Sequence, residues 1–440
     1  MEDRRIMEQL AHITTSQRIL GSLSHDERNA MLEAIALSLE AKKKRIFQAN
    51  ERDLEKADEE HLAGPLRKRL VFDEVKLKQV CEGLRQVAAL PDPIGRVRER
   101  RTLDEGLLLE RVDVPIGVIG MVFESRPDAL VQILSLCLKS GNAIVLKGGR
   151  EALETNRELV SVIREALSDY TAKSGWIVHL ESREDVHLLL GMDDVVDLLI
   201  PRGSNEFVRY IMENTKIPVL GHADGICALY IDSSADLAMA VPIAVDSKCQ
   251  YPAVCNAVET ILVHASVADA FIPRFAEAVR PWSVVIHGDD RVCDIIDCIP
   301  AQSRDWDTEY LDYEVAVKVV DSLDEAIEHI ARHGSSHTDG IVTSDENAAR
   351  IFLRKVDSAD VFWNCSTRFA DGFRYGLGAE VGISTQKIHA RGPVGMDGLV
   401  IGKWLLKGNG HIVDTYAKGK SFAFKELSVD GANLFQEDDA

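Results

Sequence analysis

Short apolar runs alternate with amphipathic helical segments over most of this 440-residue chain, and this alternation restricts its fold most strongly. Strand patterns at 117–123, 142–146 and 195–200 are separated or followed by helical patterns, of which 129–139 and 204–212 are the clearest. Such alternation with short connections predicts mainly parallel, doubly wound sheets. A second series follows Cys255, with strand patterns at 258–263, 284–286, 315–320, 340–343 and 361–365 and helical patterns at 267–279, 324–332 and 346–355.

The two series predict two α/β domains that meet near residues 245–255, preceded by about a hundred residues of helical periodicity. A junction between domains is a common place for a ligand site. The formal net charge of −20 repels polyanions, so we expect no nucleic-acid or anionic-membrane role. We also expect a cytoplasmic protein, because the sequence has neither a secretory signal pattern nor an apolar run of membrane-spanning length.

The eight cysteines are spread along the chain without C-x-x-C pairs or clusters with histidine. This spacing argues against a structural metal site and favours reduced thiols, most of them buried and inert. Two of them, Cys249 and Cys255, lie in one segment at the expected junction. Pro252 and Asn256 favour a loop around Cys255, which suits a nucleophile, but Cys249 beside Lys248 remains a competing candidate.

The usual dinucleotide fingerprint G-x-G-x-x-G is missing, since Gly376-Leu-Gly378 has the wrong spacing. Two strand ends carry a cation and small residues instead: Lys147-Gly-Gly149 and Pro201-Arg-Gly-Ser204. The carboxyl ends of parallel strands are where open α/β sheets bind ligands, and a helix beginning at Ser204 suits phosphate. Each segment is equally compatible with an ordinary strand-to-helix turn.

The cysteine segment Gln250-x-Pro-x-Val-Cys-Asn-Ala-x-Glu-Thr260 resembles the gamma-glutamyl phosphate reductase family of the aldehyde dehydrogenase superfamily. The resemblance continues in order along the chain, from about residue 20 to residue 425. It includes Pro115-Ile-Gly-Val-Ile-Gly120, Gly141-Asn-x-x-Val-Leu-Lys-Gly-Gly149, Ile200-Pro-Arg-Gly-Ser204, Asp305-Trp-Asp-Thr-Glu-Tyr-Leu311, Gly376-Leu-Gly-Ala-Glu-Val-Gly382 and His389-Ala-Arg-Gly-Pro393.

The resemblance implies NADPH-dependent reduction of L-glutamyl 5-phosphate to L-glutamate 5-semialdehyde, the second step of proline biosynthesis from glutamate. Cys255 and Asn256 are the implied catalytic residues, with Cys255 forming a thioester as phosphate leaves. The substrate would contact Ser125, Arg126, His222 and Arg391. For Arg126 the alternative is a salt bridge to a neighbour, for Arg391 and His389 a role in loop packing, and for His222 a role as a proton relay or as an ordinary satisfied histidine.

The resemblance also assigns the cofactor, NADPH or NADP, to residues at the two strand ends and to one glutamate: Lys147, Gly148, Gly149, Arg202, Gly203, Ser204 and Glu309. For Glu309 the alternative is a capping or surface carboxylate. The hydrolytic members of the superfamily carry a general-base glutamate, and here the corresponding segment, Leu220-Gly-His-Ala-Asp-Gly225, has His222 near that position. A reaction that exchanges the thioester with phosphate has no need of an activated water.

The implied fold is aldehyde dehydrogenase-like, with two Rossmann-like doubly wound domains and a β-hairpin oligomerisation arm. We expect a cofactor-binding domain at 1–100 and 115–246, a catalytic domain with the nucleophilic cysteine at 247–405, and the arm at 101–114 and 411–425. A homodimer or homotetramer follows, and functional coupling to glutamate 5-kinase is conceivable. Two alternatives stay open: a superfamily member that acts on another aldehyde or acyl-CoA, and a non-catalytic scaffold, against which the Cys255-Asn256 pair argues.

Overall fold

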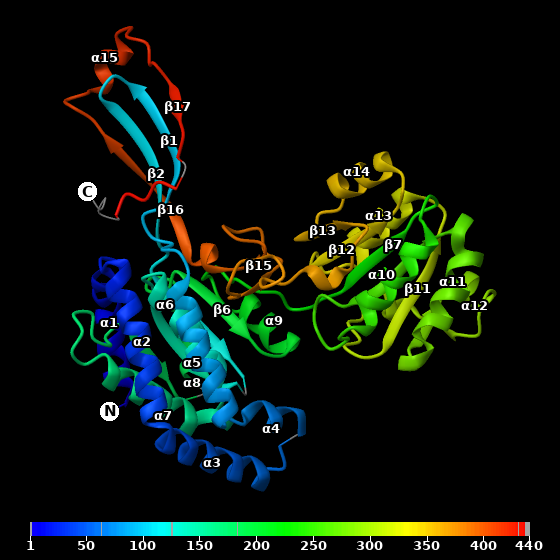
Figure 1. Ribbon diagram of the computed structural model, residues 1–440, viewed down its shortest axis with the longest axis horizontal. Helices are drawn as coiled ribbons and strands as arrows, with labels where there is room; N and C mark the ends of the chain where they lie inside the picture. The colour runs from blue at the N-terminus through cyan, green and yellow to red at the C-terminus, as the bar shows by residue number, and fades with distance from the viewer. Residues whose placement is uncertain (1, 63, 125, 183, 430, 436–440) are drawn as a thin grey trace. The chain divides into compact units, whose positions relative to one another are not determined.

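The computed structural model describes residues 2–62, 64–124, 126–182, 184–429 and 431–435. It divides the chain into two compact units, unit 1 from 1–219 and 395–440, and unit 2 from 220–394 (Figure 1). Among the described residues, no helix is both long and apolar enough to cross a membrane.

Unit 1 begins with five helices that the sequence predicted only as a helical region. Ser24 caps the second of them, because its hydroxyl accepts from the Glu27 backbone while the Glu27 carboxylate accepts from the Ser24 backbone, a reciprocal capping box. The helices are α1 (Glu2–Gly21), α2 (His25–Ala41), α3 (Lys43–Glu59), α4 (Gly64–Leu70) and α5 (Glu74–Ala89).

A four-stranded parallel sheet with the order β5-β4-β3-β6 forms the centre of unit 1. Its strands β3 and β4 are buried along their whole length, as expected for a parallel sheet covered on both faces. The elements are β3 (Val118–Phe123), α6 (Pro127–Lys139), β4 (Ala143–Gly148), α7 (Leu153–Ala166), β5 (Ile177–Leu180), α8 (Glu184–Leu190), β6 (Leu198–Arg202) and α9 (Asn205–Glu213). Of these, the short edge strand β5 and the short helix α8 were not predicted.

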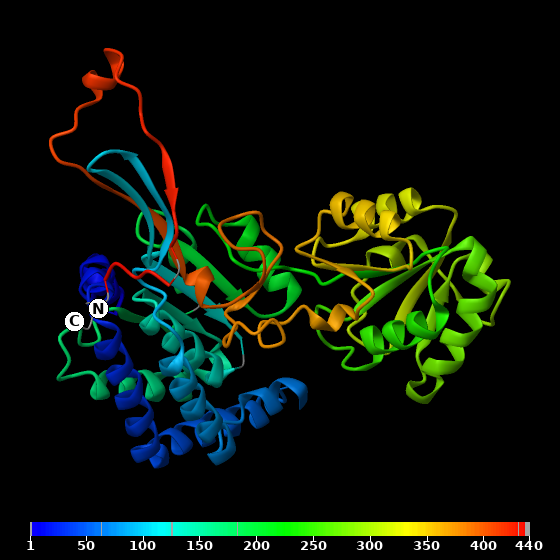
Figure 2. The ribbon, with the colours of Figure 1, turned by 45° about the horizontal axis from the view of Figure 1, so that its top comes forward.

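Unit 2 holds a seven-stranded sheet with the order β10-β9-β11-β8-β7-β12-β13. Neighbouring β7 residues face opposite sides: Leu229 packs with the cluster of α10 and α11, and Tyr230 with the cluster of α13 and α14, so both faces are covered (Figure 2). The elements are β7 (Cys227–Ile231), α10 (Leu237–Cys249), β8 (Val258–His264), α11 (Ala265–Val279), β9 (Val285–Gly288), α12 (Asp290–Cys293), β10 (Ile299–Pro300), β11 (Glu314–Val320), α13 (Leu323–His333), β12 (Thr338–Val342), α14 (Glu346–Lys355), β13 (Asp360–Trp363), β14 (Gly382–Ser384) and β15 (Gly392–Val394).

The boundary between the units differs from the sequence expectation. The second series of strands begins with β7 and not after Cys255, because β7 pairs in parallel with both β8 and β12. Residues 220–246, expected in the cofactor-binding domain, therefore belong to unit 2. Consequently the cysteine segment lies inside unit 2 and not at its border.

A separate four-stranded antiparallel sheet, with the order β16-β2-β1-β17, corresponds to the expected arm (Figure 1). Strands β1 (Val97–Asp104) and β2 (Leu107–Pro115) form a hairpin whose turn uses Gly106 at φ +72°, a conformation that favours glycine. The expected second half, 411–425, holds mainly a loop and the short helix α15 (Val413–Ala417).

The main partner of β2 is instead β16 (Val400–Lys407), with β17 (Lys425–Leu427) on the far edge. The stretch 395–405, expected in the catalytic domain, is thus part of unit 1. Continuous pairing along β2, from Val400 opposite Pro115 to Lys407 opposite Leu108, is the physical reason.

One disulfide corrects the expectation of reduced thiols. Cys293 and Cys298 are joined across the short turn between α12 and β10, with their Cα atoms 5.5 Å apart. Their spacing along the chain is not C-x-x-C, so no sequence motif indicated the pairing. Four of the six remaining cysteines are buried, and Cys255 and Cys365 are partly exposed.

Candidate functional site

Cys255 lies in the short segment that connects α10 with β8, and its side chain is partly exposed. Its competitor Cys249 is the last residue of α10 and is buried within the hydrophobic core of unit 2. Burial raises the pKa of the Cys249 thiol to about 11, so almost none of it is thiolate at neutral pH. Of the two cysteines that the sequence could not separate, Cys255 is therefore the better candidate nucleophile.

Three neighbouring parallel strands of unit 2 begin close to Cys255, in the sheet order β8-β7-β12. Cys255 precedes β8, His222 and Gly225 precede β7, and His337 precedes β12 directly. The candidate groups thus gather at the amino ends of three adjacent strands. They are also tied together directly, because the Cys227 thiol at the start of β7 donates to the Cys255 carbonyl oxygen at 3.1 Å.

Two imidazoles accompany the Cys255 thiol. Its Sγ atom and one ring nitrogen each of His222 and His337 lie within 4.8 Å of one another. The His222 Nδ1 atom lies 2.9 Å from the Ile383 carbonyl oxygen, which only accepts, so Nδ1 carries the proton and Nε2 the lone pair. His337 is fully buried, and burial holds its pKa well below the usual range, so this ring is neutral.

Gly225 allows the cysteine segment to approach the start of β7. A Cβ atom at this position would lie 2.1 Å from the Cys255 carbonyl oxygen and 2.5 Å from the Cys255 Cα, closer than real side chains come to a backbone. The position of Cys255 therefore depends on the missing side chain of Gly225.

We expect Gly225→Ala to lower turnover by about a hundredfold, because a displacement of about 1 Å at a reacting group costs that much. The matched control is Gly83→Ala in α5, where an added methyl meets nothing within 4 Å and alanine favours the helix. Steady-state kinetics with urea unfolding of both variants checks this. Full activity in Gly225→Ala would contradict the close approach.

Arg368 is a cation that interacts with Cys255. It could not be recognised from the sequence, because a single arginine in a loop forms no pattern. It is buried, and its Nε donates to the Gln250 Oε1 at 2.9 Å. Burial and then the charge of Arg374 lower the pKa of Arg368, whereas interaction with Cys255 opposes this shift. The interaction that raises the pKa of Arg368 equally favours the thiolate form of Cys255.

A fully buried ion pair joins α10 and β8, the two elements on either side of the cysteine segment. The Lys248 Nζ in α10 and the Glu259 Oε2 in β8 lie 2.5 Å apart, and both side chains have no exposed area. The Tyr310 ring is 5.9 Å from Nζ, and the Leu311 backbone donates to the Glu259 Oε1 at 3.4 Å. Burial raises the pKa of Glu259 to about 7 against the opposing effect of Lys248.

Asn256, expected beside Cys255 as a catalytic residue, is buried. Its Nδ2 donates to the Ala370 carbonyl oxygen at 2.7 Å, so the side chain fixes the loop after β13 against the cysteine segment. The negative charge of Glu309 helps to raise the pKa of Glu259. Glu309 lies two residues before Leu311, whose backbone donates to Glu259. Arg391 forms an ion pair with Asp357 at 2.9 Å, the loop-packing arrangement weighed for it from the sequence.

In unit 1 the two segments predicted to bind the cofactor meet at one edge of the parallel sheet. Phe123 at the end of β3 is in register with Gly148 of β4 on one side and with Arg202 of β6 on the other. The Lys147 Nζ is buried and donates to the Gly148 carbonyl oxygen at 2.5 Å, and burial lowers the pKa of its ammonium group. Added Cβ atoms would collide with side chains at Gly148, Gly149 and Gly203.

The start of α9, predicted from the sequence to suit a phosphate, is bonded in the structure to a carboxylate of the same chain. The Ser204 backbone N–H donates to the Glu124 Oε2 at 2.8 Å, and the Ser204 side chain makes no capping bond. Arg126, the residue before α6, is 54% exposed and pairs with Asp128 at 3.5 Å, which is the neighbouring salt bridge weighed as its alternative. Ser125 lies outside the described residues.

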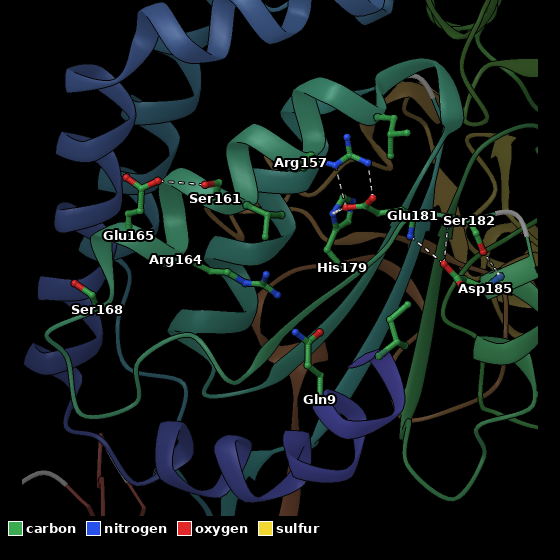
Figure 3. A pocket seen from close by; sticks show the side chains of 13 residues that line it. Gln9, Arg157, Ser161, Arg164, Glu165, Ser168, His179, Glu181, Ser182 and Asp185 are labelled. Carbon is green, nitrogen blue, oxygen red and sulfur yellow. Dashed lines mark hydrogen bonds and ion pairs between the residues drawn. The ribbon is translucent and has the colours of Figure 1, made fainter. Parts of the chain in front are cut away.

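A separate pocket of about 940 Å³ lies in unit 1 between α1, α7 and β5 (Figure 3). Polar groups in its wall bind one another. The Arg157 Nη2 donates to Glu181 at 2.6 Å, and the Ser161 hydroxyl donates to Glu165 at 3.1 Å. Burial lowers the pKa of His179 in its wall to about 4. None of the residues predicted from the sequence lines this pocket.

Comparisons with known proteins identify the family and the fold of this chain. The sequence model described as "Aldehyde dehydrogenase family" matches residues 5–312. A gamma-glutamyl phosphate reductase of Pelotomaculum thermopropionicum is 56% identical over 414 residues, which cover 94% of this chain and 95% of that protein.

Among solved structures, the gamma-glutamyl phosphate reductase of Thermotoga maritima is 38% identical, with a TM-score of 0.90 and coverage of 92% of this chain and 99% of that one. An acetylating aldehyde dehydrogenase of Geobacillus thermoglucosidasius, at 15% identity and TM-score 0.62 with 93% and 97% coverage, shares the fold.

Proposed function

This chain belongs to the aldehyde dehydrogenase family, in its gamma-glutamyl phosphate reductase branch, and we propose that it reduces L-glutamyl 5-phosphate to L-glutamate 5-semialdehyde with release of phosphate. This is the second step of proline biosynthesis from glutamate. The observation that carries the proposal is the partly exposed Cys255 thiol with two imidazoles and a guanidinium around it. An acyl phosphate has an electrophilic carbon and a good leaving group, which suits a thiolate nucleophile.

In the proposed reaction the Cys255 thiolate attacks the acyl carbon and phosphate leaves, which gives a thioester. The His222 Nε2 accepts the thiol proton, because its Nδ1–H is held by the Ile383 carbonyl. Arg368 stabilises the thiolate before the attack. The Cys255 backbone N–H is the proposed donor to the oxyanion.

NADPH is the proposed reductant, and when bound it would supply the hydride that reduces the thioester. The residues present fit a dinucleotide. The backbone carries no side chain at Gly148, Gly149 and Gly203, and the backbone N–H at the α9 N-terminus binds an anionic group, the Glu124 carboxylate. The proposed cofactor residues are Lys147, Gly148, Gly149, Arg202, Gly203, Ser204 and Glu309. The preference for NADPH over NADH rests on the family resemblance of the segment in which two glycines follow Lys147.

The test is the reverse reaction, in which glutamate 5-semialdehyde and NADP⁺ are incubated with and without inorganic phosphate. We expect NADPH absorbance to rise only with phosphate, because His222 replaces the glutamate that would activate water. Equal rates without phosphate would identify a hydrolytic enzyme and contradict the proposal. Turnover that requires coenzyme A in place of phosphate would favour the acyl-CoA alternative.

The arm supports a homo-oligomer as a further part of this proposal. Trp404 and Leu406 lie two residues apart on β16, so they share one face, and they are 51% and 58% exposed. Phe424, beside the arm strand β17, is 67% exposed. Exposed apolar groups on a sheet indicate a surface that another protein chain covers.

We expect Leu406→Glu to shift the particle mass from a dimer or tetramer towards the single chain, because it places a charge on the apolar face. Light scattering after size-exclusion chromatography measures this. Lys403→Glu on the same strand is the control for added charge, and its mass should stay that of the unchanged protein. A single-chain mass for the unchanged protein would contradict the homo-oligomer.

A further inference from the structure

The group of Cys255, His222 and His337 has the donor atoms of a soft-metal site. A thiolate and two neutral imidazoles suit Zn²⁺ or Co²⁺, whereas Mg²⁺ and Ca²⁺ prefer oxygen ligands. All three candidate donor atoms lie within 4.8 Å of one another. In a tetrahedral zinc site, bonds of about 2.0–2.3 Å place the donor atoms about 3.5 Å apart, so a movement of about 1 Å closes the group around an ion.

Two further observations point to a ligand at this place. The His222 Nδ1–H donates to the Ile383 carbonyl oxygen at 2.9 Å, the arrangement that usually orients a metal-binding histidine. The fully buried His337 has no hydrogen-bond partner for Nε2 among the described residues, while its Nδ1 lies 2.8 Å from the Thr338 hydroxyl. A buried polar atom without a partner is costly, and a bound ion would remove that cost.

We propose that the Cys255 Sγ and one ring nitrogen each of His222 and His337 bind a thiophilic divalent cation, Zn²⁺ in particular, and that this binding reversibly inactivates the thiol. Binding displaces the thiol proton, and the sulfur electron pair that would attack the substrate is donated to the ion. A fourth position is left for water. The inactivation, though not the binding, rests on the proposed function of Cys255 as nucleophile.

Binding is tested first with Co²⁺ as a coloured probe on the chelator-treated full chain. We expect one Co²⁺ per chain with a sulfur-to-cobalt charge-transfer absorption in the near ultraviolet, and its loss when Zn²⁺ is added as competitor. Cys255→Ser should lose the absorption, and His222→Gln should weaken Co²⁺ binding by at least about tenfold, the effect of 1.4 kcal/mol. His222 is only partly buried, so this variant tests the site even if His337→Gln does not fold.

Matched controls are Cys365→Ser, which removes the other partly exposed thiol, and His12→Gln, which removes an exposed histidine of α1. Both should bind Co²⁺ as the unchanged protein does. Absorption that persists in Cys255→Ser, or its absence in the unchanged chain, would overturn the proposal.

Inactivation is measured by mass spectrometry of iodoacetamide-treated protein. Zn²⁺ should slow alkylation of Cys255 at least tenfold and a chelator should restore it, with Cys365 as internal reference. These readouts require no turnover, so loss of the reductase activity and loss of the metal site are separate results. Turnover that remains unchanged at a Zn²⁺ concentration that blocks alkylation would refute Cys255 as the nucleophile and leave the metal site standing.

Discussion

Cys255→Ser is expected to lower phosphate-dependent turnover by at least about a thousandfold, the scale seen when a covalent nucleophile is removed. A serine hydroxyl has a far higher pKa than a thiol, and neither His222 nor Arg368 ionises it appreciably. Because Cys255 is only partly buried, the unfolding midpoint in urea should hardly change. Initial rates of NADPH formation, with the urea midpoint of the same preparation, provide the measurement.

Cys249→Ala is the matched control, because it removes the other thiol of the segment. Cys249 belongs to the core of unit 2, so this variant should keep its turnover and lose only modest stability, about 1 kcal/mol. A reversed pattern, with Cys255→Ser active and Cys249→Ala inactive, would transfer the nucleophile to Cys249.

Lys248→Met is expected to lower the free energy of unfolding of unit 2 by about 3–5 kcal/mol at pH 8. The substitution leaves Glu259 buried without its partner, and an uncompensated buried charge is costly. Hydrogen exchange of the β8 amides reports the opening free energy of unit 2 directly. Turnover should fall as well, because the ion pair fixes the segment that contains Cys255.

The pH dependence of this loss has a definite sign. Burial raises the pKa of Glu259 in the folded protein to about 7, above the unfolded value of about 4.3. Between these two pH values the folded state binds more protons than the unfolded state, so the free energy of unfolding falls as the pH rises from about 4.3 to about 7. Removal of Lys248 raises the folded pKa of Glu259 further, because the lysine lowers it. The loss in Lys248→Met should therefore be smaller at pH 6 than at pH 8.

The double variant Lys248→Met/Glu259→Leu provides the control. With both charges replaced by apolar groups, most of the lost stability should return, because no unpaired charge remains. If the double variant is as unstable as Lys248→Met at both pH values, packing and not charge explains the effect.

The strands that the sequence predicted share one property. Runs such as 118–123, 143–148 and 258–263 are mostly apolar and buried at every position, because both faces of their sheets are covered. β7 is equally apolar and was missed because a loop of irregular sequence separates it from the helical pattern at 204–212. Its membership of unit 2 depends on pairing with β8 and β12, which local sequence does not encode.

At the candidate site, too, residues beside a strand run can be proposed from the sequence, whereas residues that the fold brings together cannot. Lys147 and Ser204 could be proposed as cofactor residues because each lies at the end of a predicted strand run. His337 and Arg368 were missed because they approach Cys255 only through the arrangement of β12 and of the loop after β13. Arg126 and Arg391 form ion pairs with nearby aspartates, an outcome that depends on side-chain geometry and not on spacing.

The assembly of unit 1 from both ends of the chain has a consequence for biosynthesis. Unit 2 is continuous, so all of it leaves the ribosome before β16, and it can fold while unit 1 is still incomplete. Until residues 400–407 emerge, one edge of β2 has no pairing strand and offers a template for another nascent chain. During translation the arm is therefore the part of this protein in greatest need of a chaperone.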